Sequence, residues 1–178
     1  MGLRKALAYS KKNARPYTRH SRKKDKSYIK TVPFSKIVKF NGGDQVGYNA
    51  GKHTHQVKLI TEQWTQIRDN ALEACRMLIT KQMDTKAPGQ YYLEVKVHPH
   101  HLLRENKSAA AVAGADRIST GMTQSFGVVV GRAAIVGYGK EIFLISCANE
   151  KAARVARDAL VMTKSKVPCK TKIVFEKN

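Results

Sequence analysis

Acidic residues are scarce in this chain of 178 residues, in which 13 Asp and Glu stand against 33 Lys and Arg. The formal net charge of +20 predicts a polyanionic partner, and nucleic acid is the first candidate. Long hydrophobic runs are missing too, since no segment approaches the roughly 18 apolar residues of a membrane-spanning helix or contains the apolar region of a signal peptide. We therefore expect a soluble, cytoplasmic protein with no membrane partner.

Cysteine is rare as well, and the three cysteines are widely spaced. Without a Cys-x-x-Cys pair they predict neither a disulfide framework nor a zinc ribbon, so we expect reduced, partly buried thiols. Two histidine groups are the remaining candidates for a metal site: His53 with His55, and His98 with His100 and His101. Neither group is combined with acidic or cysteine ligands, so hydrogen bonding to RNA or solvent is the simpler role. We expect no metal and no cofactor.

Catalytic motifs are also absent. The chain has no Gly-x-Ser-x-Gly and no His-Glu-x-x-His sequence. It has no phosphate-binding loop either, because Glu141 follows Gly139–Lys140 and Ala134 stands where such a loop requires glycine. Asp116 could be nominated as a general base, but an Asx turn or an ion pair with Arg117 is the more economical role. We expect neither an enzyme nor a small-molecule substrate.

What the chain does have is a concentration of positive charge at its start. Residues 1–30 contain eleven Lys and Arg and a single acid, Asp25, so they cannot form a core of their own. Tyrosines punctuate this run, and aromatic rings between cations can stack on bases while the cations contact phosphates. The sequence predicts an RNA-binding arm; the alternatives are a solvated tail, or a segment that is disordered alone and ordered on RNA.

The candidate RNA-binding residues of this arm are Arg4, Lys5, Lys11, Lys12, Arg15, Tyr17, Arg19, Arg22, Lys23 and Lys24. Further cations extend the same attraction over the folded body, although some of them will only be solvated: Lys36, Lys39, Lys52, Lys58, Lys164, Lys166 and Lys170. Of these, Lys52 is taken as an RNA-binding candidate with the arm.

Residues 31–178 are expected to form one α+β domain. Val32–Phe40 mixes apolar and basic residues as a strand does, and Asn41–Asp44 is a turn signal before further extended chain. Helical spacing predicts a first helix from an N-cap at Thr61 to about Gln82, with Trp64 in the core. Tyr91–Val97 alternates as a half-buried strand does.

The second half of the domain repeats this pattern. Phe126–Tyr138 and Glu141–Cys147 predict two strands of a hairpin, and Asn149 with Glu150 begins a second helix with a narrow stripe of small residues. Lys172–Glu176 predicts a final strand. The expected fold class is α+β, with two helices packed on a mixed or antiparallel sheet, a basic N-terminal arm and a long central loop.

That central loop runs from about Arg104 to Thr123 and lacks large apolar residues to bury. An unstructured loop of this length in a compact domain is usually functional or disordered. Its small residues allow a close backbone approach to a partner. Its flanks carry Arg104, Asn106, Lys107 and Arg117, whose donors suit phosphate oxygens and base edges.

The sequence motifs of this region are HPHH, LLRENK, AGADR, GM and FG, with a further glycine at Gly131. Together with RPYTR, YIKTVP and SKIVKF before them and KIVFEK after them, they resemble the large-subunit ribosomal protein family called L-sixteen in bacteria and L-ten-e in archaea and eukaryotes. The resemblance covers nearly the whole chain and is to the archaeal type. It implies an α/β hammerhead-like fold.

The resemblance also implies a structural role on large-subunit rRNA, beside the central protuberance and close to the peptidyl transferase centre. The loop would approach tRNA, and it would be monitored during late subunit maturation; the implied partners are rRNA, tRNA, neighbouring ribosomal proteins and assembly factors. The positions that match the family's motifs are the ones that the resemblance places near tRNA. They are Arg104, Glu105, Asn106, Lys107, Gly114, Ala115, Asp116, Arg117, Gly121 and Met122.

Two departures limit this carry-over. The family's usual FGKPxG reads FGVVVG from Phe126 to Gly131, and its usual GMR ends in Thr123, so a cation is missing at each place. The end of the loop should depend more on apolar packing and less on phosphate contact. Charge and loop alone leave two alternatives open, a free-standing RNA-binding assembly factor and an RNA-modifying enzyme without a recognised motif.

Overall fold

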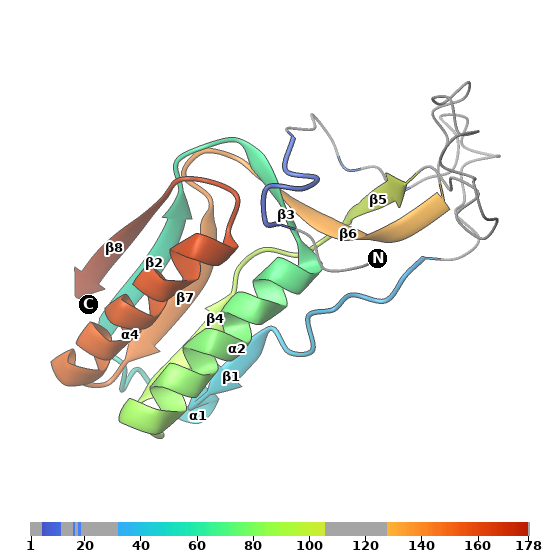
Figure 1. The fold of residues 1–178 in the computed structure, drawn as a ribbon. Coiled ribbons are helices and arrows are strands. Elements are labelled where there is room, and N and C mark those ends of the chain that lie inside the picture. The colour runs from blue at the N-terminus through green and yellow to red at the C-terminus, as the bar shows by residue number, and fades with distance from the viewer. Residues whose placement is uncertain (1–4, 12–15, 17, 19–31, 106–127, 178) are drawn as a thin grey trace, which may run out of the picture.

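The computed structural model describes residues 5–11, 16, 18, 32–105 and 128–177. These residues form two antiparallel sheets with helices packed against the larger one (Figure 1). The α+β class is therefore confirmed. Every strand pairing in the described part of the chain is antiparallel, which decides between the mixed and the antiparallel alternatives.

The larger sheet has five strands. In spatial order they are β1 (Asn41–Gly43), β4 (Tyr91–Val95), β7 (Glu141–Cys147), β2 (His55–Thr61) and β8 (Thr171–Lys177). The smaller sheet has three strands. In spatial order they are β3 (Thr65–Arg68), β6 (Val128–Val136) and β5 (His101–Glu105). β5 and β6 project from the body of the molecule (Figure 1).

Two long helices cover one face of the five-stranded sheet (Figure 1). They are α2 (Asp69–Lys86) and α4 (Glu150–Thr163), the latter followed by the short helix η2 (Lys164–Lys166). The expected stripe of small residues on the second helix is confirmed, since Ala152, Ala156 and Ala159 are all buried. Alanine has little side chain to keep neighbouring backbones apart, so α4 packs closely against both α2 and the sheet.

The other face of the sheet is covered at one end by the short helix α1 (Gln45–Asn49). Tyr48 of α1 stacks on Tyr92 of β4, with ring centroids 4.4 Å apart. The expected alternation of β4 is confirmed for Tyr91, Leu93 and Val95, which face the main core. Because α1 covers Tyr92, however, β4 is buried on both faces at this point.

The two sheets are joined by one bent ribbon of antiparallel chain. β2 pairs with β7 in the larger sheet, and the strands next to them in sequence, β3 and β6, pair with each other in the smaller one. The buried Thr61 closes the bend: its hydroxyl donates to the carbonyl oxygens of Gly137, at 2.5 Å, and Lys140, at 3.3 Å. Its backbone carbonyl accepts from the amide of Gly139 at 2.8 Å.

This bend overturns the predicted hairpin, because β6 and β7 lie in different sheets and do not pair with each other. It also overturns the predicted start of the first helix. Thr61 ends a strand instead of capping a helix, and α2 begins only at Asp69. Trp64 is 55% exposed instead of lying in the core. Its ring covers Gly137, where an added Cβ would lie 3.3 Å from the indole.

The predictions for residues 32–44 were also wrong. No strand forms over Val32–Phe40. The strand is instead β1, within the Asn41–Asp44 segment that the sequence predicted to be a turn. Two amides of this segment, those of Lys36 and Val38, are bound by side chains of α2 and so do not need a partner strand. The predicted final strand is confirmed as β8.

We expect Thr61→Val to destabilise the protein by about 1–3 kcal/mol, because two carbonyl groups at the bend lose a buried donor while the side-chain shape is kept. Urea unfolding followed by circular dichroism measures this change. The matched control is Thr85→Val, at an exposed helical position whose hydroxyl bonds only its own helix, and it should stay within about 0.5 kcal/mol of wild type. Equal stability of the two variants would show that Thr61 does not clamp the bend.

Candidate nucleic-acid interface

The few acidic side chains are mostly used inside the body of the protein. Five of them pair with four cations, Lys58, Arg76, Lys96 and Arg154, all on the five-stranded sheet or its helices. Others bind backbone amides or the Tyr91 hydroxyl. The three strands of the smaller sheet, by contrast, contain three arginines and a single acid, Glu105. Negative charge is therefore concentrated at one end of the molecule.

The first described part of the arm lies on this smaller sheet. Residues 6–9 form a turn that ends at Tyr9, whose φ of 60° places it in the left-handed region. The Thr65 hydroxyl donates to the Ser10 carbonyl at 2.9 Å, and the Gln66 side chain donates to that of Tyr9. Arg68 Nη2 donates to the Lys5 carbonyl at 3.0 Å. Three buried polar side chains of β3 thus fix the backbone of the arm.

A second segment, the strap of residues 32–40, runs from β1 toward the tips of β5 and β6 (Figure 1). Asp69 Oδ2 accepts from the Lys36 amide at 3.0 Å, and Glu73 Oε2 accepts from the Val38 amide at 3.3 Å. The Arg76 guanidinium and the Val38 amide together hold the pKa of Glu73 below its usual value. With its backbone bound inward, the strap leaves the side chains of Lys36 and Lys39 exposed.

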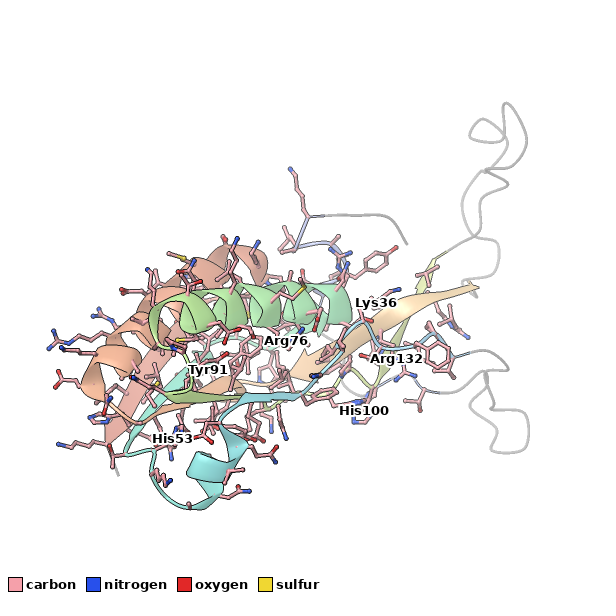
Figure 2. All side chains as sticks on the ribbon, turned by 90° about the horizontal axis from the view of Figure 1, so that it is seen from below. Lys36, His53, Arg76, Tyr91, His100 and Arg132 are labelled. Atoms are coloured by element: carbon pink, nitrogen blue, oxygen red, sulfur yellow. The ribbon has the colours of Figure 1, made fainter. Side chains whose placement is uncertain are left out.

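Arg132 of β6 ties the strap to the smaller sheet. Its Nε donates to the Pro33 carbonyl at 2.7 Å. Figure 2 places Arg132, Lys36 and His100 at the same end of the molecule, away from His53. Sequence reasoning did not single out Arg132. The available signal was a lone cation inside the otherwise apolar run VVVGRAAIV.

The central loop starts later than expected. Arg104 and Glu105 belong to β5, opposite Val129 and Val128 of β6, so the first residues assigned to the loop are part of a strand. Arg104 is half-buried there. Val129 and Val130, at the first departure from the family's usual sequence, are also half-buried, as apolar packing at the end of the loop requires. β5 and β6 thus form a paired stalk up to the two ends of the loop.

The predicted RNA-binding residues are placed only in part. Lys5 and Lys11 are exposed on the docked part of the arm. Lys52 is exposed too, but it precedes His53 at the opposite end, so the structure does not bring it together with the arm. The following candidates lie outside the described residues: Arg4, Lys12, Arg15, Tyr17, Arg19, Arg22, Lys23, Lys24, Asn106, Lys107, Gly114, Ala115, Asp116, Arg117, Gly121 and Met122.

One cation of the body has a different role from the expected one. Lys58 is shared between Glu176, at 2.6 Å, and Glu141, at 3.3 Å, and these contacts raise its pKa. It therefore joins β2 to both neighbouring strands and is not available as a phosphate ligand. Lys164 and Lys170 are exposed, and Lys166 is half-buried.

Comparison with known proteins identifies the family. A family model described as ribosomal protein L16p/L10e matches residues 16–174. The chain belongs to this family. It is 39% identical to the large ribosomal subunit protein uL16 of Staphylothermus marinus over 99% of this chain and 95% of that protein. It is 40% identical to the proteins of the same name from Methanococcus aeolicus, over 99% and 96%, and Pyrobaculum calidifontis, over 99% and 95%. The expected archaeal type is thereby confirmed.

Members of a ribosomal protein family are structural constituents, so this chain is not an enzyme. Its chemistry agrees with this. Burial raises the pKa of Cys75 and Cys147 to about 12, and that of Cys169 to about 11, so the three free thiols are protonated at neutral pH. The His53 ring is buried, with Nδ1 2.9 Å from the Ser146 carbonyl oxygen and Nε2 3.4 Å from Asp44.

Within the described ranges, no three side chains of the metal-binding types gather as a metal site would require. A groove of about 620 Å³ lies between α4 and β8. Its floor includes Val57, Ile173 and Phe175, and its cations include Arg157 and Lys172. No described helix of this family member is long and apolar enough to span a bilayer.

Proposed function

We propose that this chain is a structural component of the large ribosomal subunit in the cytoplasm and binds large-subunit rRNA through its basic arm and its three-stranded sheet. The observation that carries the proposal is the separation of charge. Acids pair with cations on the five-stranded body, while the charged residues of the arm, the strap and the strands of the smaller sheet are cations except for Asp25 and Glu105. An excess of cations of this kind attracts phosphates.

The arm of residues 1–30 supplies the largest part of this attraction in our proposal, and residues 31–178 form the body that orients it. The contacts of Thr65, Gln66 and Arg68 with residues 5–10 support this division, because they anchor the arm on the cationic end. The remaining arm cations named from the sequence would then contact rRNA phosphates, and Tyr17 would stack on a base or ribose. Lys52 would meet a separate stretch of RNA.

The loop following Glu105 is assigned to tRNA in the same proposal. Paired strands make a stiffer support than a single chain, and β5 and β6 pair up to Glu105 and Val128. Such a stalk suits a loop that must reach a fixed place, here the path of tRNA near the peptidyl transferase centre. Neighbouring ribosomal proteins and late assembly factors would contact the same region during maturation.

Neutralising arm cations should reduce the salt dependence of rRNA binding. The variant carries four substitutions, Arg19→Gln, Arg22→Gln, Lys23→Gln and Lys24→Gln. The slope of the logarithm of the association constant against the logarithm of the salt concentration should fall in magnitude by about three units, because each lost phosphate contact removes about 0.7–0.9 of a unit. Filter binding to a large-subunit rRNA fragment over a salt series measures the slope.

The control for this experiment removes the same charge from α4, η2 and β8. It carries Lys151→Gln, Arg157→Gln, Lys164→Gln and Lys172→Gln, all at exposed positions. Its slope should stay close to that of the wild type. Equal reductions in the two variants would mean that net charge alone drives binding, and the proposed interface would be wrong.

Shortening the loop should separate anchoring from function. Replacing residues 106–114 with a short Gly/Ser linker changes the free energy of loop closure by only about 1 kcal/mol, so folding and incorporation should survive. Large subunits that carry the variant should be recovered by sedimentation, but they should join small subunits late or synthesise peptide slowly. Normal peptide synthesis by these particles would reduce the loop to a passive connector.

A further inference from the structure

The chain turns from one sheet to the other at a second place, the histidine corner of His98–His101, between β4 and β5. The His100 amide donates to the His98 carbonyl at 3.0 Å and closes a tight turn around Pro99, which is buried. His101 is buried as the first residue of β5. The alternation therefore sends Pro99 and His101 inward and leaves His98 and His100 exposed on the opposite side.

The exposed rings of this corner form a stack with an aromatic residue of the strap. Phe40 and His98 lie parallel, with centroids 5.1 Å apart and an angle of 13° between the rings. His98 and His100 continue the stack at 4.2 Å and 36°. Phe40 and His98 thus lie face to face, and the tilted His100 ring extends the group, so aromatic rings from two segments gather where an unpaired base can stack on them.

The electrostatic surroundings of His98 suit a base better than a phosphate. Partial burial, with smaller contributions from His100 and Arg132, lowers the pKa of His98. The His98 ring is therefore neutral at pH 7 and contacts its neighbours as an aromatic group. Cations for phosphate are nearby but separate: Arg132 lies at the same end, and Lys36 is exposed on the strap (Figure 2).

The position of the stack adds a second argument. The strap joins the corner to the basic arm, while β5 leads from the corner directly to the loop. RNA that contacts both the arm and the foot of the stalk would pass the stacked rings. Metal binding is not indicated here, since the described residues contain no group of three or more side chains that could hold a metal ion.

We propose that His98 and His100 form a stacking site for an unpaired base of rRNA, with Arg132 and Lys36 contacting the adjoining phosphates. The proposal deepens the proposed function and rests on it. It assigns to this end of the protein a contact with the base itself, in addition to charge attraction.

The test compares two single-stranded probes of equal length and charge, a ten-nucleotide oligoadenylate and the same backbone without bases. In the full-length protein, NMR signals of the His98 and His100 ring protons should move upfield with the oligoadenylate and stay in place with the abasic strand, since only stacked bases exert a ring-current shift. The double variant His98→Ala and His100→Ala should bind the oligoadenylate roughly tenfold more weakly, and the abasic strand as tightly as wild type does.

The control is His55→Ala, which removes a histidine paired with another aromatic ring, Phe175, on the five-stranded sheet. It should change neither affinity. Ring signals that respond equally to both probes, or a double variant with unchanged preference for bases, would overturn the stacking site alone. Failure of wild type to bind either probe would instead count against the proposed function. A double variant that binds RNA normally but is excluded from subunits would assign the corner to a protein neighbour and overturn the proposal.

Discussion

The bend between the two sheets is the constraint on which the rest of the structure depends. β2–β3 and β6–β7 would form one long flat ribbon if they ran on without interruption, and the smaller sheet would then extend the larger one. Thr61 prevents this, because its hydroxyl and backbone bind the turn at residues 137–140. The Trp64 ring covers Gly137 at the bend. The stalk of β5 and β6, with the loop that it carries, consequently projects away from the helices.

Charged residues are also distributed differently between the larger and the smaller sheet. The body can bury a large apolar core while keeping its cations because the scarce acids are placed there, as in the pairing of Lys58 with two carboxylates. Asp69 and Glu73 serve a different purpose, since they bind the amides of the strap and turn its lysines outward. The charged residues at the other end, on the strands of the smaller sheet, are mainly cations. Such an end is self-repelling until a polyanion covers it, which links the stability of the arrangement to RNA binding.

Much of the fold could be predicted from local patterns. Alternation identified β4, the final strand β8 was also predicted, and small residues at helical spacing identified the buried face of α4. The bend could not be predicted, since Thr61 has the features of a helix cap and Trp64 those of a core residue until the distant turn at residues 137–140 is placed beside them. The arm was predicted from its charge, but its docking depends on Gln66 and Arg68, two polar residues whose burial no local pattern indicates. The lack of large apolar residues predicted a loop from about Arg104, whereas the extension of β5 to Glu105 depends on pairing with β6.

A cryo-EM reconstruction of large subunits that carry this chain is the most direct measurement of the central claim. It places the protein against the rRNA without assuming any contact. The account predicts that the strap, the histidine corner and the smaller sheet face rRNA, with the arm threaded between RNA segments and the loop directed toward the tRNA path. A protein seated on rRNA through α4 and β8, with the smaller sheet and the arm facing solvent, would contradict it.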